Sequence, residues 1–208
     1  MRFFLLFLVF LSGCISLPNS SPVPRFYSLE SLNPDPEMIP KQQDKMNGVL
    51  LGLGPVSIPE YCNRPQIVTK DKEGAFSYAQ FERWSEPLAD ALGRTIMLNT
   101  LKLLPKANVV LFPWPGSLPV KFQVILRIVE LECRLADEVK MTVQWLVIQS
   151  GSSRVLSSNL KTYKQQLDGS NYPALTKGMS RICLLLSSDI AQDLVKILDD
   201  SKVISQPR

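Results

Sequence analysis

Residues Val120 to Cys133 read VKFQVILRIVELEC, and they form the clearest β-strand pattern in the chain. Apolar and polar residues alternate up to Ile128, which is the period of two expected for a strand with one buried face. Beyond that point the apolar phase changes, so that Val129, Leu131 and Cys133 become the apolar positions. This change predicts either a β-bulge or a strand that is covered on both faces.

Two more strands follow this one. Residues 139–147 alternate in the same way, and Ser150-Gly151-Ser152-Ser153 has the composition of a turn. Residues 154–166 then form a third long strand. Because the connections are short, the three strands predict an antiparallel meander.

Two helices are predicted from apolar residues at intervals of three and four. For the first, Ser85 is the expected cap, with Glu86 and Pro87 in the first turn and Pro105 beyond the end. Its apolar stripe consists of Leu88, Leu92, Ile96 and Leu103. The second helix is predicted over residues 172–198, and we expect the tail at 201–208 to be frayed.

The remaining strands are predicted at 25–32, 49–58 and 108–112, with a hairpin formed by 67–69 and 75–78. Together these elements predict one α/β (α+β) domain over residues 25–200. It is a single-domain sandwich in which two main helices cover a mixed sheet.

The N-terminus has the pattern of an export signal. Arg2 precedes an apolar run from Phe3 to Leu11, and Leu11-Ser12-Gly13-Cys14 resembles the bacterial lipobox. The run is too short for a transmembrane helix, which needs roughly 20 residues. We therefore expect a signal peptide at 1–13 and a lipidated Cys14, carrying a diacylglyceryl thioether and an N-acyl (palmitate-type) chain.

The sequence after the lipobox predicts a tether and a location. Residues 14–24 contain three prolines and three serines after Cys14, a composition that favours an extended chain reaching about 30 Å. Ile15 stands where aspartate retains many Gram-negative lipoproteins in the inner membrane. We therefore expect a lipid anchor in the outer membrane, on its periplasmic face.

Composition argues against catalysis and against nucleic acid as a partner. The chain has no histidine, which excludes Ser-His-Asp and Cys-His nucleophiles and histidine metal ligands. Gly52-Leu53-Gly54-Pro55 begins like a dinucleotide-binding motif, but Ser57 replaces the third glycine, so it is interpreted as a strand ending in a turn. The formal net charge of the chain is +4, and the basic residues are scattered along the sequence without the cluster that a nucleic-acid-binding surface needs. We expect no enzyme activity and no cofactor besides the lipid.

Three cysteines remain after Cys14. Cys62, Cys133 and Cys183 have spacings that match no zinc site, and an odd number leaves at least one free thiol. The apolar surroundings of Cys133 and Cys183 predict buried structural thiols. Whether any pair forms a disulfide is left open by the sequence.

Several blocks resemble one known family. They are residues 54–61 (GPVSIPEY), 64–68 (RPQIV), 81–88 (FERWSEPL) and 112–114 (FPW), with the strand start at 25–27. With the lipobox, these blocks resemble the PqiC-like lipoproteins, also called ABC-type transport auxiliary lipoproteins. The resemblance implies a fold like the anticodon-binding-like or TolB N-terminal domain.

The same resemblance implies a non-enzymatic role. Such lipoproteins work with periplasmic MCE-domain proteins and an inner-membrane permease in moving lipids between the two membranes. This chain would be the outer-membrane component that docks the MCE partner. A homo-oligomer is compatible with ring-shaped MCE partners.

Four residues are candidates for partner binding: Tyr61, Arg64, Gln66 and Trp84. Each also has a structural alternative, namely loop solvation for Arg64 and Gln66, half-buried packing for Tyr61 and support of the helix start for Trp84. Trp114 is expected to be structural, and Trp145 is expected in the core.

Two other functions stay open. The domain could itself carry a lipid in an apolar cavity lined by residues such as Phe122, Leu126 and Met141. The second alternative, an envelope hydrolase, lacks any recognisable nucleophile motif. The transported molecule cannot be deduced from the sequence.

Overall fold

The computed structural model describes residues 22–152 and 154–204, so the predicted signal peptide, Cys14 and most of the tether lie outside it. The helices are α1 (Leu88–Leu103) and α2 (Tyr172–Ile204), with short 3-10 turns η1 (Pro36–Met38), η2 (Gln43–Met46) and η3 (Glu60–Cys62). The strands are β1 (Arg25–Tyr27), β2 (Leu50–Ser57), β3 (Gln66–Lys70), β4 (Phe76–Trp84), β5 (Asn108–Leu111), β6 (Phe122–Cys133), β7 (Glu138–Gln149) and β8 (Arg154–Gln166).

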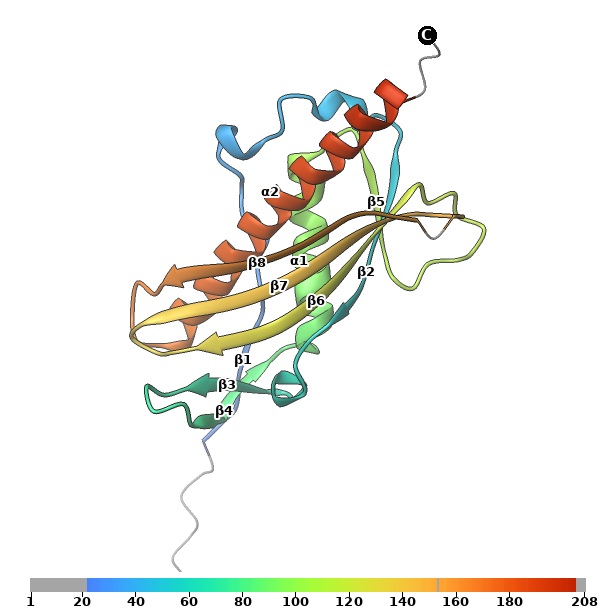
Figure 1. The fold of residues 1–208 in the computed structure, drawn as a ribbon. Helices are drawn as coiled ribbons and strands as arrows, with labels where there is room; N and C mark the ends of the chain where they lie inside the picture. The colour runs from blue at the N-terminus through green and yellow to red at the C-terminus, as the bar shows by residue number, and fades with distance from the viewer. Residues whose placement is uncertain (1–21, 153, 205–208) are drawn as a thin grey trace, which may run out of the picture.

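The larger sheet has five strands in the order β5-β2-β6-β7-β8 (Figure 1). Strand β2 is parallel to both β5 and β6. The pairs β6–β7 and β7–β8 are antiparallel, so the predicted meander is confirmed. The sheet is therefore mixed, with its parallel half made by strands that are far apart in the sequence.

The phase change in β6 corresponds to a β-bulge. The register between β6 and β7 shifts between Ile128 and Glu130. Ile128 and Leu131 are 2% and 4% exposed, whereas Val129 between them is 48% exposed. The predicted bulge is confirmed, and it returns Leu131 and Cys133 to the core face, whereas Val129, predicted to belong to the same run, is exposed at the bulge.

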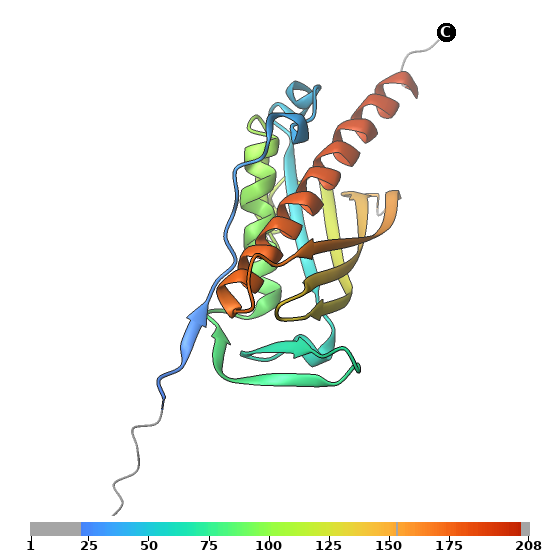
Figure 2. The same cartoon turned by 90° about the vertical axis from the view of Figure 1, so that its left-hand side faces the viewer.

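Both helices lie on the same side of the five-stranded sheet (Figure 2). Helix α1 packs on β2 and β5, and α2 packs on β7 and β8. All four residues of the predicted stripe on α1 are buried, and so is Trp145. Helix α2 extends beyond its predicted end and includes positions 201–204, where we expected a frayed tail. Positions 205–208 lie outside the described residues.

The predicted cap of α1 is wrong. The helix begins at Leu88 with Pro87 in the N-cap position, and no side chain caps it. The backbone N–H of Ser85 instead donates to the carbonyl of Tyr27 at 2.8 Å. Ser85 is thus tied to β1, at the end of β4, and lies too early in the chain to cap the helix.

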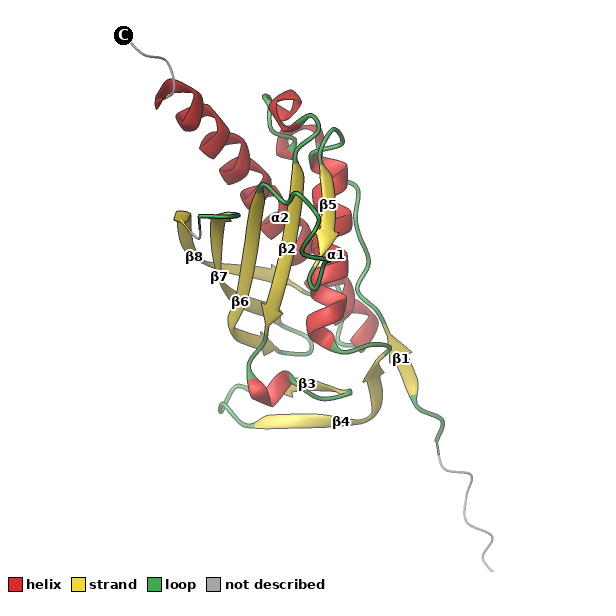
Figure 3. Cartoon of the chain, turned by 90° about the vertical axis from the view of Figure 1, so that its right-hand side faces the viewer, coloured by secondary structure: helices red, strands yellow, loops and turns green. Residues whose placement is uncertain are grey.

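A second sheet of three strands, in the order β1-β4-β3, lies beside the larger one (Figure 3). The predicted hairpin is confirmed as β3–β4, but it belongs to this small sheet and not to the mixed one. Strand β1 is parallel to β4 and covers only 25–27 of the predicted range 25–32. The single α+β domain is confirmed, with the small sheet as an addition.

The ion pair of Arg25 and Glu82 joins β1 to β4. The Nε atom of Arg25 donates to both carboxylate oxygens of Glu82, at 2.9 and 3.0 Å. The Glu82 side chain is only 8% exposed. The hydrogen bond from Arg25 is the main reason that the pKa of Glu82 is lowered, and burial opposes it.

The lowered pKa predicts a dependence of stability on pH. A carboxylate with a depressed folded-state pKa adds stability above its unfolded pKa, about 4.3, and this stability is lost as the pH falls. We expect the Glu82→Gln variant to be less stable than the natural chain at neutral pH, by an amount that shrinks as the pH falls through the lowered pKa of Glu82. Urea unfolding across a pH series measures this; a constant difference would contradict it.

The other face of β2 is covered by an indole ring. A Cβ atom at Gly52 would lie 2.4 Å from a ring carbon of Trp114, so the ring lies directly on the strand backbone. Trp114 belongs to residues 112–121, the connection from β5 to β6 (Figure 3). The expected structural role of Trp114 follows from this contact. The interpretation of Gly52-Leu53-Gly54-Pro55 is confirmed for the strand but is wrong for the turn, because β2 continues to Ser57 with a register shift between Leu53 and Val56.

We expect Gly52→Val to lower the free energy of unfolding by about 1–3 kcal/mol, because the new side chain must displace the indole. Gly116→Ala is the matched control in the same connection, because a Cβ there meets nothing within 4 Å. Urea unfolding followed by near-ultraviolet circular dichroism measures both. Equal midpoints for Gly52→Val and the control would refute the packing argument.

Candidate docking groove

Three family-like blocks that are distant in the sequence meet at the start of α1. They come from the end of β2, the end of β5 and the segment between β4 and α1. They border a hollow of about 420 Å³. Its lining residues are Leu53, Gly54, Pro55, Val56, Glu86, Ala89, Asp90, Gly93, Arg94, Leu111, Phe112 and Pro113.

The floor of this hollow is apolar. A Cβ atom on Gly93 of α1 would lie 3.5 Å from Val56 and 3.8 Å from Leu111, so the helix approaches both strands closely. Gly54 has a φ angle of +111°, and a Cβ there would lie 2.9 Å from the Cβ of Phe112. Glycine is therefore favoured at position 54 for two reasons: it adopts a positive φ angle without strain, and it has no Cβ atom to clash with Phe112. The ring of Phe112 is left 52% exposed at the edge.

The rim of the hollow carries charge. The Nε and Nη2 atoms of Arg94 donate to the same oxygen of Glu86, at 3.0 and 2.5 Å. Nη2 also donates to the carbonyl of Leu29 at 3.2 Å. Asp90 is exposed on the adjacent turn. An apolar floor with fixed charges at its edge has the composition of a site that binds a partner segment.

A second hollow of about 340 Å³ adjoins the first at Glu86. It is lined by Asn63, Arg64, Pro65, Trp84, Ser85, Glu86, Pro87 and Leu88. We call the two hollows together the motif groove. Sequence reasoning missed Ala89 and Arg94, which lie outside the family-like blocks, whereas Val56, Glu86 and Phe112 lie inside them and could have been proposed.

Two of the four predicted partner-binding residues lie in the motif groove. The guanidinium of Arg64 stacks on the ring of Tyr78, at 3.9 Å from its centroid. Trp84 is 6% exposed, and its backbone N–H donates to the carbonyl of Pro65 at 2.7 Å. Trp84 thus mainly supports the wall of the groove, and only its edge is open to a partner.

The other two residues join strands. The Tyr61 hydroxyl accepts a hydrogen bond from the N–H of Leu131 at 3.0 Å and donates one to its carbonyl at 3.2 Å. Its ring stacks on Phe76 with centroids 4.6 Å apart. Gln66 pairs with Arg83 in the register of β3 and β4. Tyr61 is therefore the joint between the small sheet and β6, and burial raises its pKa.

The residues suggested for an interior lipid cavity are packed in the core. Phe122, Leu126 and Met141 are 4%, 0% and 0% exposed, on the sheet face that the helices cover. Leu126 and Met141 line neither hollow of the motif groove.

Cys62, Cys133 and Cys183 are buried free thiols, so the expected burial of Cys133 and Cys183 is confirmed. Burial raises the pKa of Cys62 and of Cys183 to about 12, and it raises that of Cys133 as well. These thiols are protonated at neutral pH and therefore poor nucleophiles.

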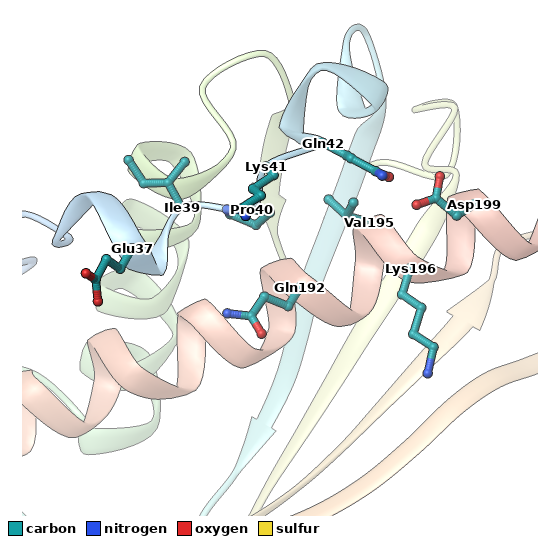
Figure 4. A pocket seen from close by; sticks show the side chains of 9 residues that line it. All are labelled: Glu37, Ile39, Pro40, Lys41, Gln42, Gln192, Val195, Lys196 and Asp199. Atoms are coloured by element: carbon teal, nitrogen blue, oxygen red, sulfur yellow. The ribbon is translucent and has the colours of Figure 1, made fainter.

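Another hollow, of about 360 Å³, lies between the segment 37–42 and the last turns of α2 (Figure 4). Its lining mixes charges of both signs, with Lys41 and Lys196 near Glu37 and Asp199. An ion pair between Lys45 and Asp199 lies close by. None of the family-like blocks contributes to it.

In the part of the chain that the structure describes, no helix is both long and apolar enough to cross a membrane. Within the same residues, no group of three or more cysteine or carboxylate side chains is arranged to hold a metal ion.

Comparison with known proteins agrees with this fold. The family model for the ABC-type transport auxiliary lipoprotein component matches residues 27–191, and the chain belongs to that family. A search of curated protein sequences gives no match.

Two solved structures have the same fold. A crystal structure of an uncharacterized protein has a TM-score of 0.67 at 17% identity and covers 83% of this chain and 99% of its own. The protein XCC0632 from Xanthomonas campestris, of family DUF330, has a TM-score of 0.66 at 10% identity and covers 86% of this chain and 99% of its own.

Tyr61→Phe tests the joint between the sheets. Removing the hydroxyl leaves the N–H and carbonyl of Leu131 without their partner, so we expect the free energy of unfolding to fall by about 1–3 kcal/mol. Tyr78→Phe is the control, because Tyr78 is 50% exposed, and a change within about 0.5 kcal/mol is expected there. Chemical denaturation of both variants gives the comparison, and equal losses would argue against the joint.

Proposed function

We propose that this protein is a non-enzymatic adaptor, anchored through Cys14 to the periplasmic face of the outer membrane. In this proposal it docks a periplasmic MCE-domain protein whose inner-membrane permease drives lipid transport. Membership of the transport auxiliary lipoprotein family supports the transport role. The lipobox-like sequence supports the anchor.

The observation that carries the docking role is the convergence of the family-like blocks on one groove. Folding brings Pro55, Glu86 and Phe112 to the edge of the same hollow, although they lie on three different segments. The Phe112 ring packs edge-to-face on Trp114, with centroids 5.6 Å apart, yet about half of its surface stays exposed toward the hollow. An aromatic ring at the edge of an apolar groove is the kind of residue that dominates binding energy in protein interfaces.

The groove best suits an apolar segment of the partner that carries a basic residue. Val56, Ala89 and Leu111 offer the apolar contact, and Asp90 offers an exposed carboxylate at the rim. Arg64, in the second hollow, extends the contact toward the small sheet. Arg94 and Glu86 already satisfy each other, so they position the rim more than they bind.

The carrier alternative has less support, because Leu126 and Met141 are fully buried in the core cluster. Phe122 lines a separate hollow of about 260 Å³ to which neither of them contributes. A homo-oligomer stays compatible with the adaptor role, and the experiment below does not depend on it.

Ala89→Arg tests the groove. Ala89 is half-buried in the first turn of α1, and an arginine there fills the apolar hollow. We expect recovery of the MCE-domain partner in crosslinking pull-downs from native membranes to fall about tenfold, which corresponds to about 1.4 kcal/mol of binding. The matched control is Ala174→Arg, the same change in the first turn of α2 at a half-buried alanine.

The same pull-down also tests the lipid anchor. Cys14→Ala should mislocalise the protein, so that the partner is no longer recovered because the two proteins are no longer in the same place. Ala89→Arg should leave the protein in the outer-membrane fraction. Undiminished recovery with Ala89→Arg would remove the groove from the proposal, and recovery of lipid without any MCE-domain protein would favour the carrier.

A further inference from the structure

The small sheet carries most of the exposed aromatic surface of the described residues. Among the described residues, four aromatic side chains are substantially exposed: Phe26 (64%), Phe76 (40%), Tyr78 (50%) and Phe112 (52%). Three of them belong to β1 and β4, and Phe112 alone lies elsewhere. Phe26, Phe76 and Tyr78 lie outside the core cluster, so core packing does not account for their large apolar rings.

The aromatic rings of the hairpin are held in place by cations. Arg64 stacks on Tyr78, and the Nζ atom of Lys70 lies 5.5 Å from the centroid of the Phe76 ring. The stack of Phe76 on Tyr61 fixes the hairpin to β6. The result is a rigid surface of half-exposed rings with amphipathic cations beside them.

The position of this aromatic surface relative to the tether indicates what the surface contacts. The chain enters the fold at Pro22 and passes directly into β1, so the small sheet is the part of the domain next to the tether (Figure 1). The last turns of α2 lie at the opposite end (Figure 2). Ten residues lie between Cys14 and Arg25, and an extended chain over that span reaches at most about 40 Å. A lipid on Cys14 would therefore hold the small sheet within that reach of the bilayer and nearer to it than the far end of the domain.

We propose that the β3–β4 hairpin, with Phe76 and Tyr78, rests in the headgroup region of the membrane that holds the lipid anchor. Tyrosine favours this interface because its ring contacts lipid while its hydroxyl stays in water, and Phe76 on the same strand adds apolar surface. The inference rests on the proposed function, because the anchor brings the sheet to the bilayer.

The contact is aromatic more than electrostatic. Lys70 and Lys72 are balanced by Asp71 and Glu73 in the same hairpin. Lys70 is further engaged with Glu132 at 2.5 Å. With no net positive charge to attract anionic lipid, the hairpin should contact neutral and anionic surfaces alike.

The test is a polarity-sensitive fluorophore on cysteines introduced into the lipidated full chain. Phe76→Cys and Lys72→Cys place it on the hairpin, and Leu160→Cys places it on β8, at a residue that is 67% exposed. The three natural thiols are buried and should stay unlabelled. Labelling at position 72 keeps the Phe76 ring, so it still reports on the hairpin if the Phe76→Cys change perturbs the structure.

Each labelled protein is attached to vesicles of phosphatidylethanolamine and phosphatidylglycerol, and to vesicles of phosphatidylcholine alone, with and without a spin-labelled lipid. We expect a blue-shifted emission and several-fold stronger quenching at the hairpin positions than at position 160, in both vesicle types. Flotation of the vesicles is measured first, because loss of flotation would overturn the anchor and this inference together.

If the protein floats but the hairpin labels report water, the anchor stands and the hairpin contact is wrong. Quenching confined to the phosphatidylglycerol vesicles would also overturn it, in favour of binding by charge.

Discussion

Strand β2 has parallel neighbours on both sides, and this constraint shapes the rest of the molecule. Parallel strands cannot be joined by a tight turn, so each connection must carry the chain back along the sheet. The connection from β2 to β5 returns through α1, on the face that both helices cover. The connection from β5 to β6 is the irregular segment 112–121 with no helix, and Trp114 within it packs on Gly52. A side chain at position 52 would clash with Trp114 and so would push segment 112–121 away from the sheet.

The small sheet and the motif groove follow from the first of these connections. The chain makes β3 and β4 between the end of β2 and the start of α1, so the hairpin is inserted into a crossover and lies below the larger sheet (Figure 1). Several contacts then hold it: the Arg25–Glu82 and Lys70–Glu132 ion pairs and the Tyr61–Leu131 hydrogen bonds. The groove opens beside another ion pair, Arg94–Glu86 at the start of α1, next to the ends of β2 and β5. Its walls are therefore made by the segments that connect the two sheets, and those segments contain the family-like blocks.

The sequence predicts the local elements well because their signals are local. The alternation in β6 and β7, the bulge near Val129 and the stripe on α1 all depend on residues within one element. The second sheet could not be deduced in this way, because β1 and β4 pair across a separation that leaves no periodic trace. The same holds for Ser85, which makes a backbone bond to Tyr27 although its position suggests a cap. For the site, Arg64 and Trp84 were predicted from the blocks, but the groove itself depends on which strand ends become neighbours. Periodicity in one strand does not contain that information.

Strand β8 forms the outer edge of the five-stranded sheet, and along one side its backbone groups have no neighbouring strand. An edge of this length is a hazard at high local concentration, because another chain can add to it as a further strand. Acylation would concentrate the protein on a surface and increase that hazard. One feature of the strand opposes it: the register with β7 shifts near Leu156, and such an irregularity makes an edge harder to extend. Lys161 and Lys164 of the same strand are engaged with Asp189 and Glu138. The irregular edge is therefore a poorer template for a further strand than a flat one, which would matter for a population crowded by the proposed anchor.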